Sequence, residues 1–79
     1  MAVKAYVLAN VSTDNVSETL KELKKIAGIS SADAVTGPYD MIIKVEAESV
    51  DHLGKLVTTK ILSLKGVAKT LTCIIMQQG

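Results

Sequence analysis

The chain has 79 residues, with nine basic residues against eight acidic ones and a formal net charge of +1 at pH 7. Hydrophobic residues make up 48% of it, yet Phe and Trp are absent and every basic residue is a lysine. These values exclude a disordered segment, and the lack of the planar arginine fork that grips phosphate and guanine disfavours direct nucleic-acid binding. We therefore expect a single domain over residues 1–79 with an aliphatic core and no nucleic-acid partner of its own.

The first residues and the cysteine content predict a cellular location. Residues 1–11, MAVKAYVLANV, lack both the charged and apolar regions of a signal peptide and the long apolar span of a membrane helix. The single cysteine, Cys73, excludes an internal disulfide. We expect a cytoplasmic protein without a membrane partner.

The first half of the chain predicts a strand followed by a helix. Residues 3–11 are apolar on both alternating faces, which is typical of a strand covered on both sides. Residues 14–27 carry apolar side chains at helical spacing, and Glu18 stands three residues after Asn15, as in a capping box. Gly28 then predicts the end of the helix.

The second half repeats this order. Residues 29–36 alternate weakly and predict an edge strand, whereas residues 41–47, MIIKVEA, predict a strong one. Ser49 predicts the start of a longer helix that closes at Gly66, and residues 67–76 form the last expected strand. The apolar stripe expected along the second helix consists of Leu53, Leu56, Val57, Ile61 and Leu64.

The order strand, helix, strand, strand, helix, strand predicts an α+β, ferredoxin-like βαββαβ fold with a four-stranded antiparallel sheet. Right-handed crossovers place both helices on one face. The other face would expose more apolar surface than a monomer usually tolerates, so we expect the sheets of two copies to pair. One face is expected to carry Val3, Val7, Ile43 and Val45 and the other Tyr6, Leu8, Ile42, Ile74 and Met76, and whichever set lacks helices forms the open face.

The residue types needed for catalysis or metal binding are scarce. The only histidine, His52, lies in the predicted first turn of the second helix, where we expect it to be exposed. Cys73 lies inside an apolar strand and is interpreted as a buried structural thiol. No glycine-rich phosphate loop is present. We expect no catalytic residue, no metal site and no cofactor.

One polar stretch is not explained by the fold, namely residues 36–40, TGPYD. Gly-Pro predicts a hairpin turn, but a turn requires neither Tyr39 nor Asp40. Thr70 and Thr72 lie on one face of the last predicted strand, a pattern that β-propensity alone can also produce. Together a carboxylate, a phenol and two hydroxyls suit a small zwitterion, whose ammonium needs an anion and whose carboxylate needs donors.

At this point the chain resembles the effector-binding domain of the Lrp/AsnC transcription regulators, also called the domain for regulation of amino-acid metabolism. The likeness spans essentially the whole chain and is carried by KAYVLANV, KKIAGISSADAVTGPYDMIIKVEA and LSLKGVAKTLTCIIM. Its most specific part is V-T-G-x-Y-D before an apolar strand, with G-V-x-x-T-x-T about thirty residues later. The resemblance implies the βαββαβ fold, sheet-to-sheet dimers and, in many members, a ring-like octamer of four dimers.

The resemblance also implies a binding site. In that family, amino acids or related small effectors bind between dimers at sites that include the glycine-tyrosine-aspartate turn. Carried over, Gly37 supplies the tight turn and an accessible amide, Tyr39 forms a side wall, and Asp40 meets the effector ammonium. Thr70 and Thr72 line the floor or meet the effector carboxylate. The residues implicated more loosely are Val50 and Cys73.

Regulators of this family carry an N-terminal winged helix-turn-helix, whereas here Met1 leads almost directly into the first predicted strand. We expect a stand-alone effector domain that regulates transcription through partners, for example full-length regulators of the family in mixed oligomers. The same residues also fit the effector-binding part of a longer protein. Two alternatives stay open, a purely structural oligomerisation module and a small cofactor-free dimeric enzyme, which a pocket holding His52 and Tyr6 would favour.

Overall fold

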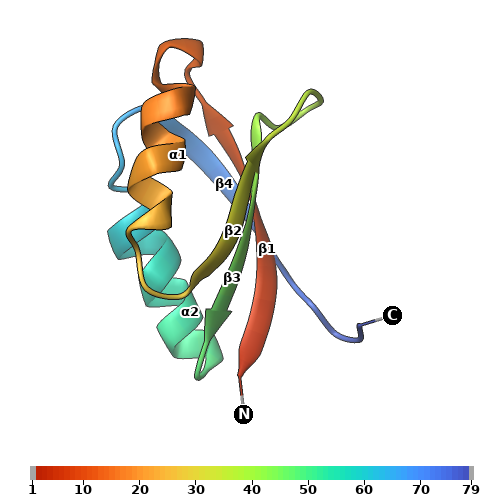
Figure 1. The fold of residues 1–79 in the computed structure, drawn as a ribbon. Coiled ribbons are helices and arrows are strands. Elements are labelled where there is room, and N and C mark those ends of the chain that lie inside the picture. The colour runs from red at the N-terminus through yellow and green to blue at the C-terminus, as the bar shows by residue number, and fades with distance from the viewer. Residues whose placement is uncertain (1, 79) are drawn as a thin grey trace.

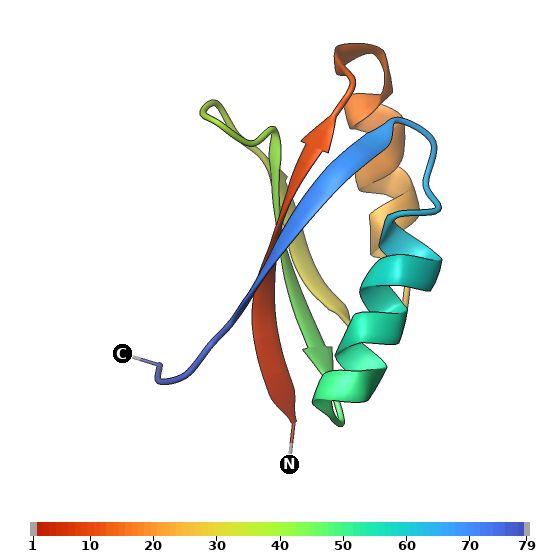
Figure 2. The same ribbon diagram turned by 180° about the vertical axis from the view of Figure 1, so that it is seen from behind.

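The computed structural model describes residues 2–78, and their strands form one four-stranded antiparallel sheet with both helices on the same face (Figure 1 and Figure 2). The sheet order is β2-β3-β1-β4, so β2 and β4 are the edges. This is the predicted ferredoxin-like βαββαβ architecture. The strands are β1 (Val3–Val11), β2 (Ile29–Ala34), β3 (Met41–Ala47) and β4 (Val67–Ile74). The helical elements are the 3-10 turn η1 (Thr13–Asn15), α1 (Val16–Lys24), α2 (Val50–Leu56) and the π-helical segment η2 (Val57–Ile61).

The core lies between the helices and the two central strands. Every second residue of β1 and β3 is buried there, and the helices contribute the opposite wall. Burial of such aliphatic side chains stabilises the fold by about 25 cal/mol per Å² of apolar surface removed from water. The core side chains are Ala5, Val7, Ala9, Val11, Leu23, Met41, Ile43, Val45, Leu53, Val57 and Ile61.

Three of the predicted helix signals are confirmed. Gly28 and Gly66 have φ of 96° and 92°, the left-handed conformation that closes a helix at low cost only with glycine. Ser49 caps α2, because its Oγ accepts a hydrogen bond from the His52 backbone amide at 3.1 Å.

The predicted capping box at the start of α1 is wrong. Asn15 occupies the N-cap position but makes no side-chain cap; its amide instead donates to Ser12 Oγ at 2.6 Å. The preceding η1 turn changes the direction from which the chain enters the helix, so the Asn15 side chain points back to Ser12.

The predicted apolar stripe of the second helix is confirmed, but the helix is not uniform. The Leu62 amide donates to the Val57 carbonyl at 2.9 Å, five residues back, so the helix is underwound over η2. Leu53, Val57 and Ile61 are spaced four residues apart, more than one α-helical turn. Underwinding keeps all three against the core.

Strand β4 corrects two predictions. Ile74 pairs with Ala5 and therefore lies on the helix side of the sheet, not on the same face as Tyr6 and Leu8, and Met76 lies beyond the end of β4. Cys73 pairs with Tyr6 on the open face and is exposed rather than buried. A shift of one residue in register moves every side chain of a strand to the other face, and the apolar pattern of β4 does not specify its register.

The open face is apolar at its centre. Tyr6 and Leu71 are 41% and 46% exposed, and the Lys44 ammonium lies 6.0 Å from the centroid of the Tyr6 ring. Leu8 pairs with both Ile42 and Leu71, which places these three side chains side by side. Across residues 2–78, the helices are too short or too polar to span a bilayer.

Candidate functional site

Residues 36–39, here called the proline turn, connect β2 to β3 (Figure 1). The turn is closed by a hydrogen bond from the Val35 amide to the Asp40 carbonyl at 2.9 Å. Gly37 has φ of 152°, a conformation that L side chains rarely adopt, so the turn requires glycine there. The predicted hairpin turn is therefore present, and it projects from one end of the sheet.

The Asp40 side chain joins this turn to the end of β1. Its Oδ2 accepts a hydrogen bond from the Val11 amide at 2.9 Å, and the Asp40 amide donates to the Ala9 carbonyl at 2.9 Å. The β1–β4 register shifts between Asn10 and Val11. The carboxylate thus holds a backbone amide at an irregularity of the strand. Sequence reasoning missed this contact, because its partner is backbone and no side-chain pattern marks it.

A second cross-strand contact holds the turn itself. The side-chain amide of Asn10 donates to the Pro38 carbonyl at 3.1 Å. Asn10 alternates with the buried Ala9 and Val11, so it lies on the open face of the sheet. The proline turn is therefore attached to β1 by the bond to the Pro38 carbonyl and, on its C-terminal side, by the carboxylate and the amide of Asp40.

A small pocket of about 230 Å³ lies between the proline turn and the open face. Leu8 and Ile42 form its sheet side, and they belong to the apolar open face. The turn supplies Gly37 and Tyr39, two of the residues implicated by the resemblance, and Asp40 follows them directly in the chain. The remaining lining residues are Val35, Thr36 and Pro38.

Thr70 and Thr72 are not in this pocket. They pair with Ala9 and Val7, so they share the helix-side face of the sheet as expected of alternate residues. The proline-turn pocket lies against the opposite face. Thr70 is half-buried and Thr72 is exposed, because β4 is an edge strand. One chain therefore brings Gly37, Tyr39 and Asp40 together but not the two threonines.

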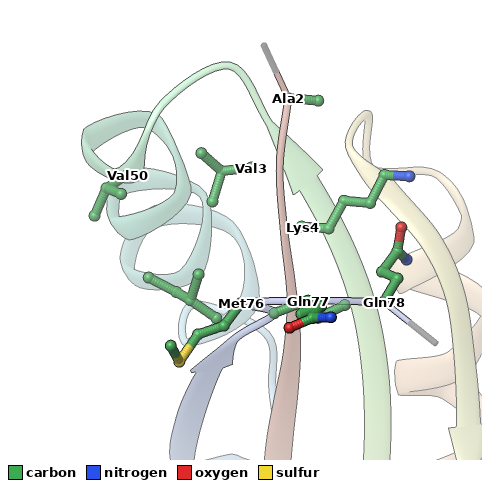
Figure 3. Close-up of a pocket in the computed structure, with 9 residues that line it drawn as sticks. Ala2, Val3, Lys4, Val50, Met76, Gln77 and Gln78 are labelled. Atoms are coloured by element: carbon green, nitrogen blue, oxygen red, sulfur yellow. The ribbon is translucent and has the colours of Figure 1, made fainter.

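A larger hollow of about 450 Å³ lies at the other end of β1, between the N-terminus of α2 and the C-terminal residues (Figure 3). Val3, Val50 and Met76 gather on one side of it, whereas Lys4 points away from them. Its other lining residues are Ala2, Ile74, Ile75, Gln77 and Gln78. None of these described residues carries a carboxylate, so they offer no anion to an ammonium group.

The residues named for a catalytic alternative do not share a pocket in the described part of the chain. His52 is exposed in the first turn of α2, where its Nδ1 lies 4.0 Å from Glu48 Oε2. Tyr6 lies on the open face, on the other side of the sheet from the helices. Within residues 2–78, no three His, Cys, Asp or Glu side chains are grouped so that they could hold a metal ion.

Comparison with known proteins identifies relatives over nearly the whole chain. The family model of the Lrp/AsnC ligand binding domain matches residues 4–78. An uncharacterised HTH-type transcriptional regulator of Pyrococcus furiosus is 30% identical over 77 residues, which cover 94% of this chain and 51% of the regulator. The chain thus spans about half the length of the curated regulators that it matches.

Two other similarities lie outside full-length regulators. Homocitrate synthase of Sulfurisphaera tokodaii is 31% identical over 70 residues, which cover 89% of this chain but only 14% of the enzyme. The crystal structure of TTHA0845 from Thermus thermophilus superposes with a TM-score of 0.90 and 30% identity, covering 98% of this chain and 96% of that one. Domains of this kind are therefore found in chains of very different length.

Proposed function

The chain belongs to the Lrp/AsnC ligand-binding domain family, and we propose that it binds an amino acid or a related small effector at the proline turn. It forms homo-oligomers, a dimer or an octamer of four dimers, and regulates transcription through partner regulators of the same family without binding DNA itself. It acts in the cytoplasm.

The observation that carries this proposal is an apolar pocket lined by Gly37 and Tyr39, with Asp40 as the next residue in the chain. One of its carboxylate oxygens accepts from Val11, and a carboxylate has about four lone-pair positions, so it can accept further hydrogen bonds from an ammonium group. Gly37 is exposed, and a Cβ at this position would meet no atom within 4 Å. The main chain at the turn is thus open to a ligand, while Tyr39, Leu8 and Ile42 offer apolar surface to its side chain.

Thr70 and Thr72 enter the same proposal from another copy of the chain. In a single chain they lie on the sheet face opposite the proline-turn pocket. Both lie on an edge strand, where Thr72 is exposed and Thr70 is half-buried, and hydroxyls can donate to an effector carboxylate. We therefore assign them to the part of the site that forms between copies, in keeping with effectors that bind between dimers.

A second function is favoured by the similarity to homocitrate synthase. There a segment that resembles this chain accompanies an enzyme rather than a helix-turn-helix. By analogy, the effector-bound domain would regulate a metabolic enzyme as a separate subunit. Chemical cross-linking in the native cells, followed by mass spectrometry, separates the two: a partner with a DNA-binding domain supports the first function, and a biosynthetic enzyme supports the second.

Effector binding itself is tested by a thermal-shift screen of the purified protein against the twenty amino acids, each at about 10 mM, since a ligand at a hundred times its Kd adds about 2.7 kcal/mol of apparent stability. Asp40→Asn is the informative variant, because it removes the charge but keeps an oxygen that can accept from Val11. Asp51→Asn, an exposed position in the first turn of α2, is the matched control.

We expect one or a few amino acids to raise the midpoint of the wild type and of Asp51→Asn but not of Asp40→Asn. If no amino acid raises the midpoint of the wild type, the effector proposal fails and the structural oligomerisation module takes its place. If Asp40→Asn responds as the wild type does, the binding site lies elsewhere in the molecule.

A further inference from the structure

We propose that Asn10 is a positioning residue for the proline turn, which holds the turn in its ligand-binding conformation before any ligand arrives. This inference rests on the proposed binding role of the turn. It identifies a residue outside the turn, on β1, as a determinant of effector affinity.

Two side-chain hydrogen bonds join β1 to the turn and to Asp40, which follows it, beside the backbone bond from the Asp40 amide to the Ala9 carbonyl. The Asn10 side chain donates to the Pro38 carbonyl at 3.1 Å, and Asp40 Oδ2 accepts from the Val11 amide at 2.9 Å. Asn10 and Val11, which are neighbours on β1, thus hold Pro38 within the turn and Asp40 directly after it. The Pro38 contact fixes the centre of the turn, and the Asp40 contact fixes the carboxylate that is proposed to meet the ammonium.

The turn needs such support because little else holds its tip. Residues 34–38 are exposed. The backbone hydrogen bonds at the base of the turn are made by Val35 and Asp40, on either side of residues 36–39. Gly37 adopts a backbone conformation open mainly to glycine, and glycine has the largest conformational freedom to lose. If ordering of the turn took place only on binding, its entropic cost would weaken the affinity. A bond to the carbonyl of Pro38, the residue after Gly37, reduces that cost in advance.

The test uses Asn10→Asp, which keeps the shape of the side chain but replaces its donor with an acceptor. The new carboxylate repels the Pro38 carbonyl and lies on the same strand end as the Asp40 contact. Asn15→Asp is the control, because it makes the same charge change and the Ser12 hydroxyl that now accepts from Asn15 can donate to a carboxylate.

The first measurement is the backbone ¹⁵N order parameter of residues 36, 37 and 39, which requires no effector. We expect order parameters of about 0.85 in the wild type and in Asn15→Asp, and below about 0.6 in Asn10→Asp. The unfolding midpoint of Asn10→Asp should match that of the wild type. A turn that is already mobile in the wild type, or one that stays rigid in Asn10→Asp, overturns the inference.

The second measurement is the Kd of the amino acid found in the screen. Loss of one hydrogen bond that orders the site should raise the Kd of Asn10→Asp about three- to tenfold, whereas Asn15→Asp should match the wild type. An unchanged Kd despite a mobile turn overturns the positioning role. If the wild type binds no amino acid, the proposed function has failed, and the order parameters still decide whether Asn10 holds the turn.

Discussion

Asp40 has one structural role and one proposed role, and mutation can separate the two. It accepts a hydrogen bond from the part-buried Val11 amide, and we propose that it also binds the effector ammonium. Asp40→Ala leaves that amide without its acceptor, so we predict a loss of about 1–3 kcal/mol in the free energy of unfolding. Asp40→Asn retains an acceptor oxygen, and we expect it to stay within about 1 kcal/mol of the wild type. Urea denaturation measures both, and equal losses would contradict the structural role.

The same residue shows how far a site can be predicted from sequence. Tyr39 and Asp40 stand out because a turn does not need them, and their closeness to Gly37 follows from the chain itself. The bond to Val11 could not be predicted, since it depends on a register shift in β1 that no side-chain pattern encodes. The separation of Thr70 from the pocket depends in the same way on the register of β4.

At the scale of elements, a glycine within α2 and a glycine between η2 and β4 should respond oppositely to alanine. Gly54 lies within α2, and a Cβ there would meet no atom within 4 Å, so Gly54→Ala should stabilise the protein by about 1 kcal/mol. Gly66 has φ of 92°, and its Cβ would lie 2.6 Å from that of Asn15. Gly66→Ala should therefore destabilise by more than about 1 kcal/mol.

Thermal unfolding checks this pair of variants, because about 1 kcal/mol shifts the midpoint by roughly 4–8 °C in a domain of this size. A lower midpoint for Gly54→Ala would mean that another molecule packs closely against Gly54, since a Cβ there meets no atom of the same chain within 4 Å. An unchanged midpoint for Gly66→Ala would mean that the chain between η2 and β4 adjusts without cost.

Elements were predictable where local pattern and packing agree. The bounds of β1 and β3 follow from long apolar runs, and each of these strands lies between two neighbouring strands of the sheet. The sequence does not predict the underwound segment η2, because apolar residues four apart also lie on one face of an ordinary α-helix. The apolar pattern of β4 predicts a buried Cys73, but the thiol lies on the open face of an edge strand and is exposed.

At the scale of the whole molecule, the open face of the sheet is the surface that we expect to join two copies. Its centre contains Tyr6, Leu8, Ile42 and Leu71, and the helices cover only the opposite face. Leu71 is 46% exposed in the single chain, so a change there should cost the monomer little. Leu71→Glu would bury an unpaired charge between the sheets, and we predict that the Kd of the dimer rises about a hundredfold or more.

Sedimentation velocity over a concentration series measures this assembly, and Leu62→Glu is the matched control. Leu62 is a comparably exposed leucine, but it follows η2 on the helix side of the molecule. We expect the wild type and Leu62→Glu to sediment as oligomers and Leu71→Glu as a monomer with an unchanged circular dichroism spectrum. Dissociation of Leu62→Glu alone would place the interface on the helices. In that case the prediction that a second copy covers the apolar open face would be wrong.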